Sequence, residues 1–344
     1  MVNENDLDEL DIQTWSAIAA GFREADLLLG NGFSVSITPR LDYRSLFDRF
    51  LGECSIESRN IFTRFETSNF ELILQKLSDA RDVDRIFGIR AERIEDAADE
   101  LKDGLIRTIQ GVHPRWTETD EQQLERIALK IDEFDDVFTL NYDLYLYRVI
   151  LILKDRLEAR RRDGENVREY SDYFWQNYDT QFLRFDSDPS HDFHGYRHQY
   201  YLHGALFLFK EPSYDYDLKL RRAESREELI EVISKNIKAG RMPLFVSEGT
   251  PEQKEQAISR SEYLTFARKR LAMSDKALVI FGTSLSDSDR HIVNAINQNK
   301  RELAVSIHIG TKLKDEVKTA EHLIRSKFPR HELVFFDSST LFAF

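Results

Sequence analysis

Four apolar segments of the sequence each end in glycine or in small polar residues, and this repeated pattern constrains the fold more than any other feature. The segments and the residues that follow them are Ala25–Leu29 with Gly30-Asn31-Gly32-Phe33-Ser34, Asp136–Leu140 with Asn141-Tyr142-Asp143, Tyr201-Leu202 with His203-Gly204, and Ala277–Phe281 with Gly282-Thr283-Ser284-Leu285. Ligands of an open α/β sheet bind at the carboxyl ends of its strands. Four such strand ends in one chain therefore predict one crevice for a nucleotide.

Length and composition are those of a folded globular protein. The 344 residues suffice for one large domain or two small ones, and 41% of them are hydrophobic. The formal net charge of -13 argues against a broad nucleic-acid surface, so no direct nucleic-acid partner is expected. It is compatible with a small anionic ligand, because the dipole of a helix N-terminus acts locally.

A single cysteine, Cys54, excludes disulfides and a four-cysteine zinc site within one chain. The first residues have neither the basic nor the apolar region of a signal peptide. The longest apolar run, Leu144–Leu153, is interrupted by Arg148 and is too short to span a bilayer. We therefore expect a cytoplasmic protein without a membrane partner.

Apolar periodicity alternates between strands and helices along most of the chain. Besides the segments above, strands are predicted at Gln199–Lys210 (a strand or hairpin), Pro243–Ser247, Ala304–Ile309 and Leu333–Phe336. Helices are predicted at Ile12–Glu24, Asp42–Phe50, Leu144–Arg160, Glu252–Met273, Asp289–Asn299 and Lys314–Lys327, with Thr250 and Pro251 as a helix start. This alternation predicts an α/β fold with a doubly wound, mostly parallel, Rossmann-like sheet and helical insertions. We expect a single domain, 1–344, with an inserted helical lobe at 51–134.

The first strand end, Gly30–Ser34, has the residues of a phosphate-binding turn. Glycine has no Cβ, so its backbone can approach a pyrophosphate closely and donate its amides. The hydroxyl of Ser34 would add a donor. The full dinucleotide fingerprint with three spaced glycines is absent, and an ordinary strand-to-helix turn explains the pattern about as well.

Asn141 and Asp143 follow a buried strand and lie two residues apart, so in an extended chain their side chains share one face. The amide of Asn141 is suited to hold a water or a ribose hydroxyl, and the carboxylate of Asp143 is suited to fix that amide. The alternative is that both residues only cap the helix that starts at Leu144.

His203 lies in an apolar setting beside Gly204, which would let a ligand approach closely. Its near-neutral pKa suits a general base, although a histidine in such a place is also typical of a hydrogen-bonded core residue. His191, His194 and His198 have a spacing that suits one helix face, but the glycine and proline among them disfavour a helix. No metal site is therefore predicted.

Gly282–Asp287 follows the most apolar strand and precedes a helix. A phosphate or a ribose would meet backbone amides and hydroxyls there. The alternative for Asp287 or Asp289 is a role as the N-cap of that helix.

Taken in order, these segments resemble the sirtuin family. The phosphate loop of sirtuins, Gly-Ala-Gly-x-Ser, matches Gly30–Ser34, and their Thr-Gln-Asn-x-Asp motif matches Thr139–Asp143. Their His-Gly and Gly-Thr-Ser-Leu motifs match His203-Gly204 and Gly282–Leu285, and Leu41–Arg44 is similar to their Pro-Asp-Phe-Arg segment. The matches are short but ordered, and they cover the predicted sheet core from about residue 25 to 310.

The chain departs from deacylating sirtuins in one respect. Those enzymes hold a zinc module on four cysteines after the His-Gly segment, whereas this chain has Cys54 alone. A second inserted region, 155–265, stands in place of that module, and its part Glu211–Glu262 is predicted to form charged helix and turn. The chain therefore looks like the zinc-free bacterial sirtuin-like proteins that hydrolyse NAD in anti-phage defence.

The resemblance implies cleavage of the nicotinamide–ribose bond of NAD+ by water, which gives nicotinamide and ADP-ribose. Asn141 would hold the water or the ribose hydroxyls, His203 would accept a proton, and Asp143 would orient Asn141 or the ribose. The residues implied to bind NAD are Gly30, Asn31, Gly32, Ser34, Arg44, Gly282, Thr283, Ser284 and Asp287. NAD is then the substrate, and neither zinc nor another metal is expected.

Two other functions remain open on the sequence. One is a regulatory module that binds NAD or ADP-ribose without turnover, and the other is a transferase that passes ADP-ribose or an acyl group to a protein. A constitutive NAD hydrolase would poison its own cell, so activity is expected to be conditional. The trigger would be assembly into a homo-oligomer or a partner protein that acts as sensor.

Overall fold

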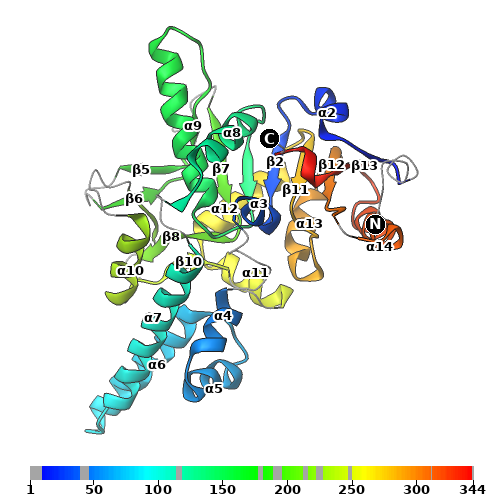
Figure 1. Cartoon of the computed structure of the whole chain (residues 1–344). Coiled ribbons are helices and arrows are strands. Elements are labelled where there is room, and N and C mark those ends of the chain that lie inside the picture. The colour runs from blue at the N-terminus through cyan, green and yellow to red at the C-terminus, as the bar shows by residue number, and fades with distance from the viewer. Residues whose placement is uncertain are drawn as a thin grey trace.

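A computed structural model describes residues 10–38, 46–113, 118–176, 181–188, 196–211, 216–221, 228–246, 250–310 and 312–342 of the chain. Its centre is an eight-stranded sheet in which every pair of neighbouring strands is parallel (Figure 1). The strands of this sheet are β1 (Ile12–Gln13), β2 (Asp26–Leu29), β3 (Val137–Thr139), β4 (Tyr170–Ser171), β7 (Arg197–Tyr201), β11 (Leu278–Phe281), β12 (Glu302–Ile307) and β13 (Glu332–Asp337).

The strand order identifies the kind of parallel sheet. From edge to edge it is β1-β13-β12-β11-β2-β3-β7-β4. Without the two short edge strands, and with the other six numbered along the chain, the order is 3-2-1-4-5-6, that of a doubly wound Rossmann sheet. The predicted fold class is therefore confirmed. The order reverses between β2 and β11, and this pair marks the topological switch point.

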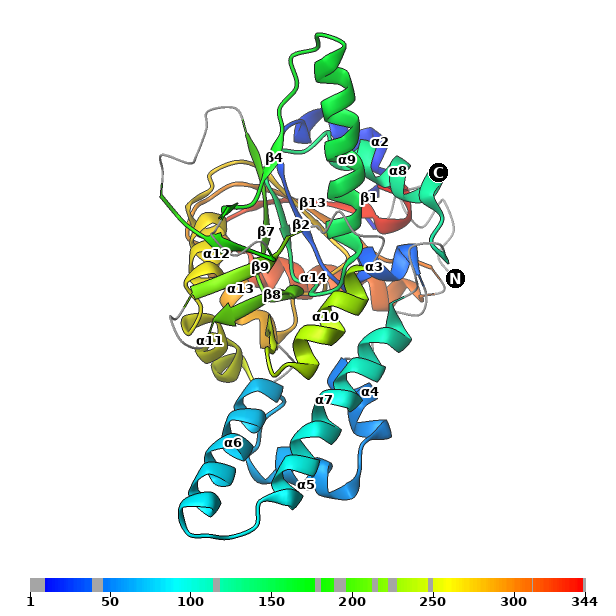
Figure 2. The same cartoon turned by 90° about the vertical axis from the view of Figure 1, so that its left-hand side faces the viewer.

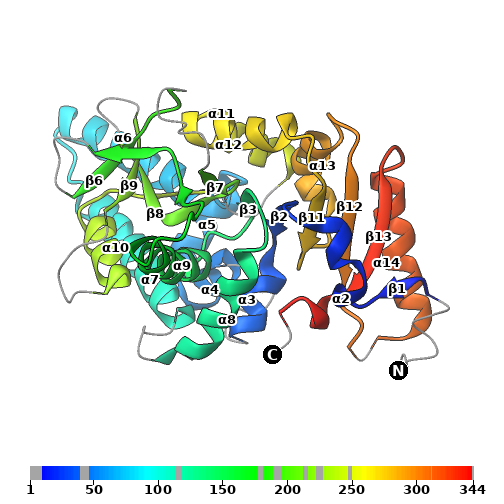
Figure 3. The ribbon, with the colours of Figure 1, turned by 90° about the horizontal axis from the view of Figure 1, so that it is seen from above.

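Helices cover both faces of the sheet, as a doubly wound fold requires. Helices α3 (Asn31–Ile37), α8 (Glu121–Ile131) and α9 (Tyr145–Arg162) lie on one side, and α12 (Glu262–Met273) and α13 (Arg290–Ile296) lie on the other (Figure 3). The remaining helical elements outside the lobe and the second sheet are α2 (Trp15–Ile18), α14 (Lys314–Lys327), and the 3-10 turns η1 (Ala19–Phe22), η4 (Asp287–Asp289) and η5 (Ser338–Thr340). Among the described residues, no helix is both long enough and apolar enough to cross a bilayer.

A helical lobe projects from the sheet layers between β2 and β3 (Figures 1 and 2). It consists of α4 (Leu46–Glu53), α5 (Ile56–Arg64), α6 (Phe70–Ile86) and α7 (Glu92–Val112). Phe47, Phe50, Phe62 and Phe70 form its centre, with ring centroids 4.8 to 5.9 Å apart in edge-on contacts. Of the segment 51–134, the last helix, α8, packs against α9 and belongs to the layer beside the main sheet.

A second sheet lies within the region 155–265. Its five antiparallel strands, in the order β10-β8-β9-β6-β5, are β5 (Phe174–Gln176), β6 (Phe182–Phe185), β8 (Gly204–Glu211), β9 (Tyr216–Leu220) and β10 (Pro243–Phe245), accompanied by α10 (Leu229–Lys238) and α11 (Pro251–Ser259). The short strand predicted at Pro243–Ser247 is confirmed as β10. The prediction of charged helix and turn for the rest of Glu211–Glu262 was wrong at β9, which pairs with β8. That pairing is set by a distant strand and leaves little trace in local periodicity.

Two predicted helices differ from the structure. The segment Ile12–Glu24 begins with β1, which pairs with β13 at the sheet edge, and continues as the short elements α2 and η1. The segment Glu252–Met273 is broken at Ser261, whose hydroxyl accepts a hydrogen bond from the Leu264 amide. The buried carboxylate of Asp217 accepts from the Ser261 hydroxyl and the Tyr263 amide, both at 2.8 Å, and fixes the break. The predicted start of α11 is confirmed, since Thr250 caps it and Pro251 is its first residue.

Gly204 joins the two sheets, because β7 ends at Tyr201 and β8 begins at Gly204. Its φ is +74°, in the left-handed region. A Cβ at this position would lie 2.1 Å from the carbonyl oxygen of Leu244. Backbone conformation and close approach of β10 thus both require glycine here.

We expect Gly204→Ala to lower the free energy of unfolding by about 3 kcal/mol or more, because strain and a backbone clash combine. Gly240→Ala is the matched control, since Gly240 has a φ of +88° but open space around its Cβ direction. Strain alone should cost the control about 1–2 kcal/mol. Urea unfolding of both variants measures the difference. Equal losses would contradict a steric role for Gly204.

Candidate functional site

The turns after β2 and β11 are in direct backbone contact at the switch point. A Cβ on Gly30 would lie 2.4 Å from the Thr283 Cβ, and one on Gly32 would lie 2.6 Å from the Gly282 Cα. Gly282 itself has a φ of +71°, and its own Cβ would meet Gly32 at 2.8 Å. These glycines are needed so that the two backbones can touch.

The backbone hydrogen bonds of this contact change the predicted role of two glycines. The Gly30 amide donates to Phe281 O and the Gly32 amide donates to Gly282 O, each at 2.8 Å. Both amides are therefore used within the protein and are not free to hold a pyrophosphate. Asn31, which lies between them and is partly exposed, remains a candidate for that contact.

A chain of hydrogen bonds connects the ends of β2 and β3. The Asn141 amide nitrogen donates to Gly30 O at 3.0 Å and to Ser34 Oγ at 2.9 Å. Ser34 Oγ in turn donates to Asp143 Oδ2 at 2.5 Å. The fully buried Ser34 hydroxyl thus positions Asn141, and in this structure it donates to Asp143.

Asp143 connects the start of α9 to Ser34, and through Ser34 to Asn141. Its Oδ1 accepts from the Tyr145 amide at 2.9 Å and so caps α9, while its Oδ2 holds Ser34. Burial raises the pKa of Asp143, and the nearby His113 and the two hydrogen bonds oppose that rise. His113 is itself buried at the end of α7, and burial lowers its pKa. The lobe therefore contributes a titratable group beside the site.

His203, at the end of β7, forms a buried pair with His291 of α13. The two Nε2 atoms are 2.9 Å apart, so in the neutral pair one of them must carry the hydrogen. Burial lowers the pKa of His203 to about 3 and that of His291 to about 4, although Asp289 opposes both shifts.

An ion pair adjoins the two histidines. Lys254 Nζ lies 2.8 Å from Asp289 Oδ1, and the same oxygen lies 4.0 Å from His203 Nε2. Burial would raise the pKa of Asp289, but His203 and Lys254 together hold it below its usual value. Asp289 is thus an ionised carboxylate beside two neutral imidazoles.

The same three groups are also suited to a divalent cation. The ligand atoms of His203, Asp289 and His291 lie within 4.8 Å of one another, and neutral imidazole is the form that binds metals. Lys254 already supplies a positive charge to Asp289, which a metal would have to displace. The prediction that the site holds no metal remains open.

The other predicted ligand residues differ in their surroundings. Thr283 Oγ1 accepts from the Leu285 amide at 3.0 Å, and Ser284 is exposed. Leu285 has a φ of +45°, a strained value for a non-glycine residue in this loop. Asp287 is exposed and 3.7 Å from Lys327 Nζ.

Neither Asp287 nor Asp289 makes the side-chain cap that was the alternative for them. Arg44, His191 and His194 lie outside the described residues. His198 stacks on Tyr173 with ring centroids 4.8 Å apart.

Sequence reasoning missed His291, Lys254 and His113, and it considered Asp289 only as a helix cap. A local signal for two of them exists, because Asp289 and His291 stand two residues apart just after the Gly-Thr-Ser-Leu motif. No local signal marks Lys254 or His113, which reach the site from α11 and α7.

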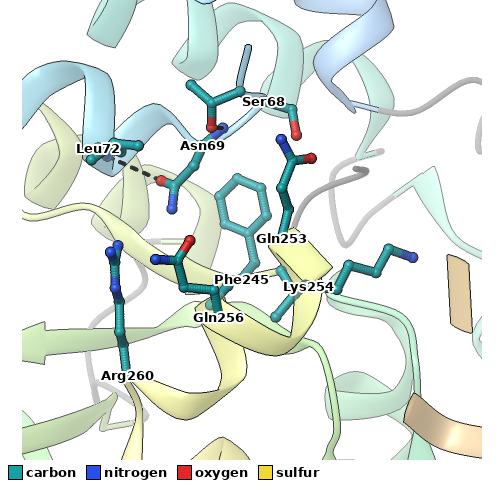
Figure 4. A pocket seen from close by; sticks show the side chains of 11 residues that line it. Ser68, Asn69, Leu72, Phe245, Gln253, Lys254, Gln256 and Arg260 are labelled. Atoms are coloured by element: carbon teal, nitrogen blue, oxygen red, sulfur yellow. Dashed lines mark hydrogen bonds between the residues drawn. The ribbon is translucent and has the colours of Figure 1, made fainter. Parts of the chain in front are cut away.

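A small hollow of about 50 Å³ lies between the lobe and α11, and Lys254 is one of the residues that line it (Figure 4). Ser68 and Asn69 approach it from the lobe, and Gln253 and Gln256 from α11, with the Phe245 ring between them. Lys254 extends from α11 away from Phe245 and reaches Asp289. The lobe thus lies against the element that carries the site's lysine.

The chain matches the model of a protein family over most of its length. A family model described as a domain of unknown function, DUF4917, matches residues 27–343, which include all but the first residue of β2 and every later element through β13. No curated protein matches the chain.

We expect Ser34→Ala to lower the free energy of unfolding by about 1–3 kcal/mol, because it leaves buried atoms of Asn141 and Asp143 without a partner. Ser36→Ala is the control, since the Ser36 hydroxyl is on the exposed side of α3 and donates only to Phe33 O. Ser36→Ala should lower the free energy of unfolding by less than about 1 kcal/mol. Chemical denaturation compares the two. A cost for Ser34→Ala no larger than for Ser36→Ala would contradict the network.

Acid should destabilise the protein through His203 and His291. Both pKa values are lowered in the folded state, so below pH about 6.5 unfolding takes up protons that the folded pair does not bind. The free energy of unfolding is therefore highest above that pH. Below it, each histidine lowers the free energy of unfolding by about 1 kcal/mol per pH unit toward pH 4. His291→Gln should flatten the dependence of unfolding free energy on pH between 7 and 5.5, whereas the exposed His322→Gln should not. Identical slopes for His291→Gln and wild type would refute the assignment.

Proposed function

We propose that this chain, which belongs to the DUF4917 family, hydrolyses NAD+ to nicotinamide and ADP-ribose at the carboxyl ends of β11, β2, β3 and β7. One observation carries the proposal. The four sequence motifs that resemble those of sirtuins follow four strands that are neighbours in the sheet, across the switch point where dinucleotides bind in this class of fold.

Asn141 is the residue proposed to hold the reacting end of the substrate. Its amide nitrogen is committed to Gly30 and Ser34, so its amide oxygen is the atom left to accept from a ribose hydroxyl or a water. Because Asp143 anchors Ser34, the orientation of the amide is fixed before substrate binds. Preorganisation of this kind lowers the cost of reaching the transition state.

The reaction breaks the bond between ribose C1′ and the nicotinamide nitrogen, and the bonding electrons leave with nicotinamide. The water oxygen then bonds to C1′, and one water proton must be accepted. We assign that role to the pair of His203 and His291. Ionised Asp289, 4.0 Å from His203 Nε2, would stabilise the imidazolium that forms.

The phosphate side of the substrate is assigned to the turns of β2 and β11. Asn31, Thr283 and Ser284 carry partly or fully exposed polar side chains there and are proposed to contact the pyrophosphate or the adenosine ribose. Asp287 is the weaker candidate because its carboxylate is close to Lys327. The proposed place of Arg44 near nicotinamide rests on the sequence resemblance alone.

A second function is favoured by the state of His203. Its pKa near 3 makes it a weak base at neutral pH, and its Nε2 is engaged with His291. These properties suit a module that binds NAD or ADP-ribose without turnover. Incubation with NAD+ separates the two functions, since only the hydrolase releases nicotinamide.

Conditional activity is part of the proposal, in keeping with an effector of bacterial anti-phage defence. The lobe contacts the site loop, because the Leu46 amide donates to the Tyr142 hydroxyl at 3.3 Å. It also contacts α11, where Gln253 donates to Glu66 O at 2.6 Å. A partner or a second copy that moves the lobe would therefore disturb residues on both sides of the site.

Asn141→Ala should lower the rate of nicotinamide release by about 100-fold or more, because it removes the fixed acceptor for ribose or water. His203→Ala should have an effect of about 100- to 10,000-fold, as is common for a lost base. Asn294→Ala, on the exposed side of α13, is the control and should keep the wild-type rate.

The assay is run at several protein concentrations, with circular dichroism to verify that each variant is folded. A rate per molecule that rises with concentration would support activation by self-assembly. Wild-type rates in folded Asn141→Ala and His203→Ala would contradict the assigned roles, and absence of nicotinamide release at every concentration would favour the binding module.

A further inference from the structure

A second cavity lies outside the proposed NAD site, between α9 and the strands β6, β7 and β9. Its volume is about 210 Å³, below the roughly 300–1,000 Å³ of pockets for drug-sized ligands. It is lined by Tyr147, Ile150, Leu151, Lys154, Leu183, Gln199, Lys219, Leu220 and Arg221. The size suits a small ion and not a dinucleotide.

The cavity is positively charged in a protein of net charge -13. Lys154, Lys219 and Arg221 contribute three cations to its wall. The buried Asp172 neutralises one of them, because Lys219 Nζ is in direct contact with its Oδ2. Among the described residues, Lys154 has no ion-pair partner within 4.0 Å. Burial lowers the pKa of Lys154, and the carboxylates of Asp172 and Glu169 oppose that shift from a longer distance. A bound anion would compensate the charge that remains.

Gln199 adds a specific demand on the ligand. Its amide nitrogen donates to Asp172 Oδ2 at 3.1 Å, so its amide oxygen is the atom that can still accept a hydrogen bond. That oxygen is buried and has no hydrogen-bond partner among the described residues, and the side chain is part of the cavity wall. Leaving a buried acceptor unpaired costs about 1–3 kcal/mol. A ligand that fits this cavity should therefore be an anion that also carries a hydrogen-bond donor.

We propose that this cavity binds inorganic hydrogen phosphate. At neutral pH this ion has oxygens to accept from Lys154 and Arg221 and one P–OH group to donate to the Gln199 amide oxygen. Sulfate has the same shape and charge but no proton to donate. The dianion of a phosphate monoester also lacks the P–OH group above its second pKa of about 6.

The site is separate from the proposed function. Lys154 is on α9, Gln199 on β7 and Lys219 on β9, and none of them is assigned to NAD. Binding of phosphate can therefore be measured directly, and its failure would leave the proposed hydrolysis untouched.

Isothermal titration of the full chain with phosphate, in a low-ionic-strength chloride buffer at pH 7.5, tests the proposal. We expect saturable binding with one phosphate per chain, and at least about tenfold weaker binding of sulfate and of methyl phosphate. Lys154→Met should weaken phosphate binding about tenfold or more, whereas Lys318→Met, at an exposed position of α14, should leave it unchanged.

Two further variants keep the test decisive. Arg221→Gln changes an exposed residue of the cavity wall and should also weaken binding, even if Lys154→Met fails to fold. Gln199→Met should abolish the preference for phosphate over sulfate. The proposal is overturned if the folded wild type shows no saturable binding of phosphate, if Arg221→Gln binds as tightly as wild type, or if sulfate binds as well as phosphate.

Discussion

The contact of backbone on backbone between the turns of β2 and β11 is the constraint on which the rest of the site depends. Gly30 and Gly32 lie so close to Gly282 and Thr283 that any side chain there would collide. This contact closes the switch point and sets where α3 begins. It thereby places Ser34 within reach of Asn141 and Asp143, so that one hydrogen-bonded network spans two strand ends. The glycines permit the close contact of the two backbones. The hydrogen bonds of the site are made by the polar side chains of Ser34, Asn141 and Asp143.

Burial governs the electrostatics of the site. The carboxyl of Asp143 and the imidazoles of His203 and His291 are all shifted toward their neutral forms by loss of water. The ion pair of Lys254 and Asp289 is the charged element that remains beside them. Interactions of such a pair with developing charge are stronger in a dry site than in water. Asp289 is therefore a fixed anion beside the two neutral imidazoles.

Much of the fold follows from local patterns in the sequence. The central strands are continuously apolar, and the bounds of α14 match the predicted Lys314–Lys327. What could not be predicted depends on distant partners, such as the strand β9 that pairs with β8, and the break at Ser261 that Asp217 fixes. The residues of the site likewise fall into those with a local sequence signal and those without one. Asn141 and His203 stand out because they follow strands, whereas Lys254 and His113 reach the site only through the packing of α11 and α7.

A crystal structure of the full chain with ADP-ribose would test the central claim most directly, because it locates the product without depending on turnover. The account predicts the pyrophosphate at the turns after β2 and β11, and the terminal ribose within hydrogen-bonding distance of the Asn141 amide oxygen. Density for ADP-ribose at another place on the protein, or a ribose far from both Asn141 and His203, would contradict it.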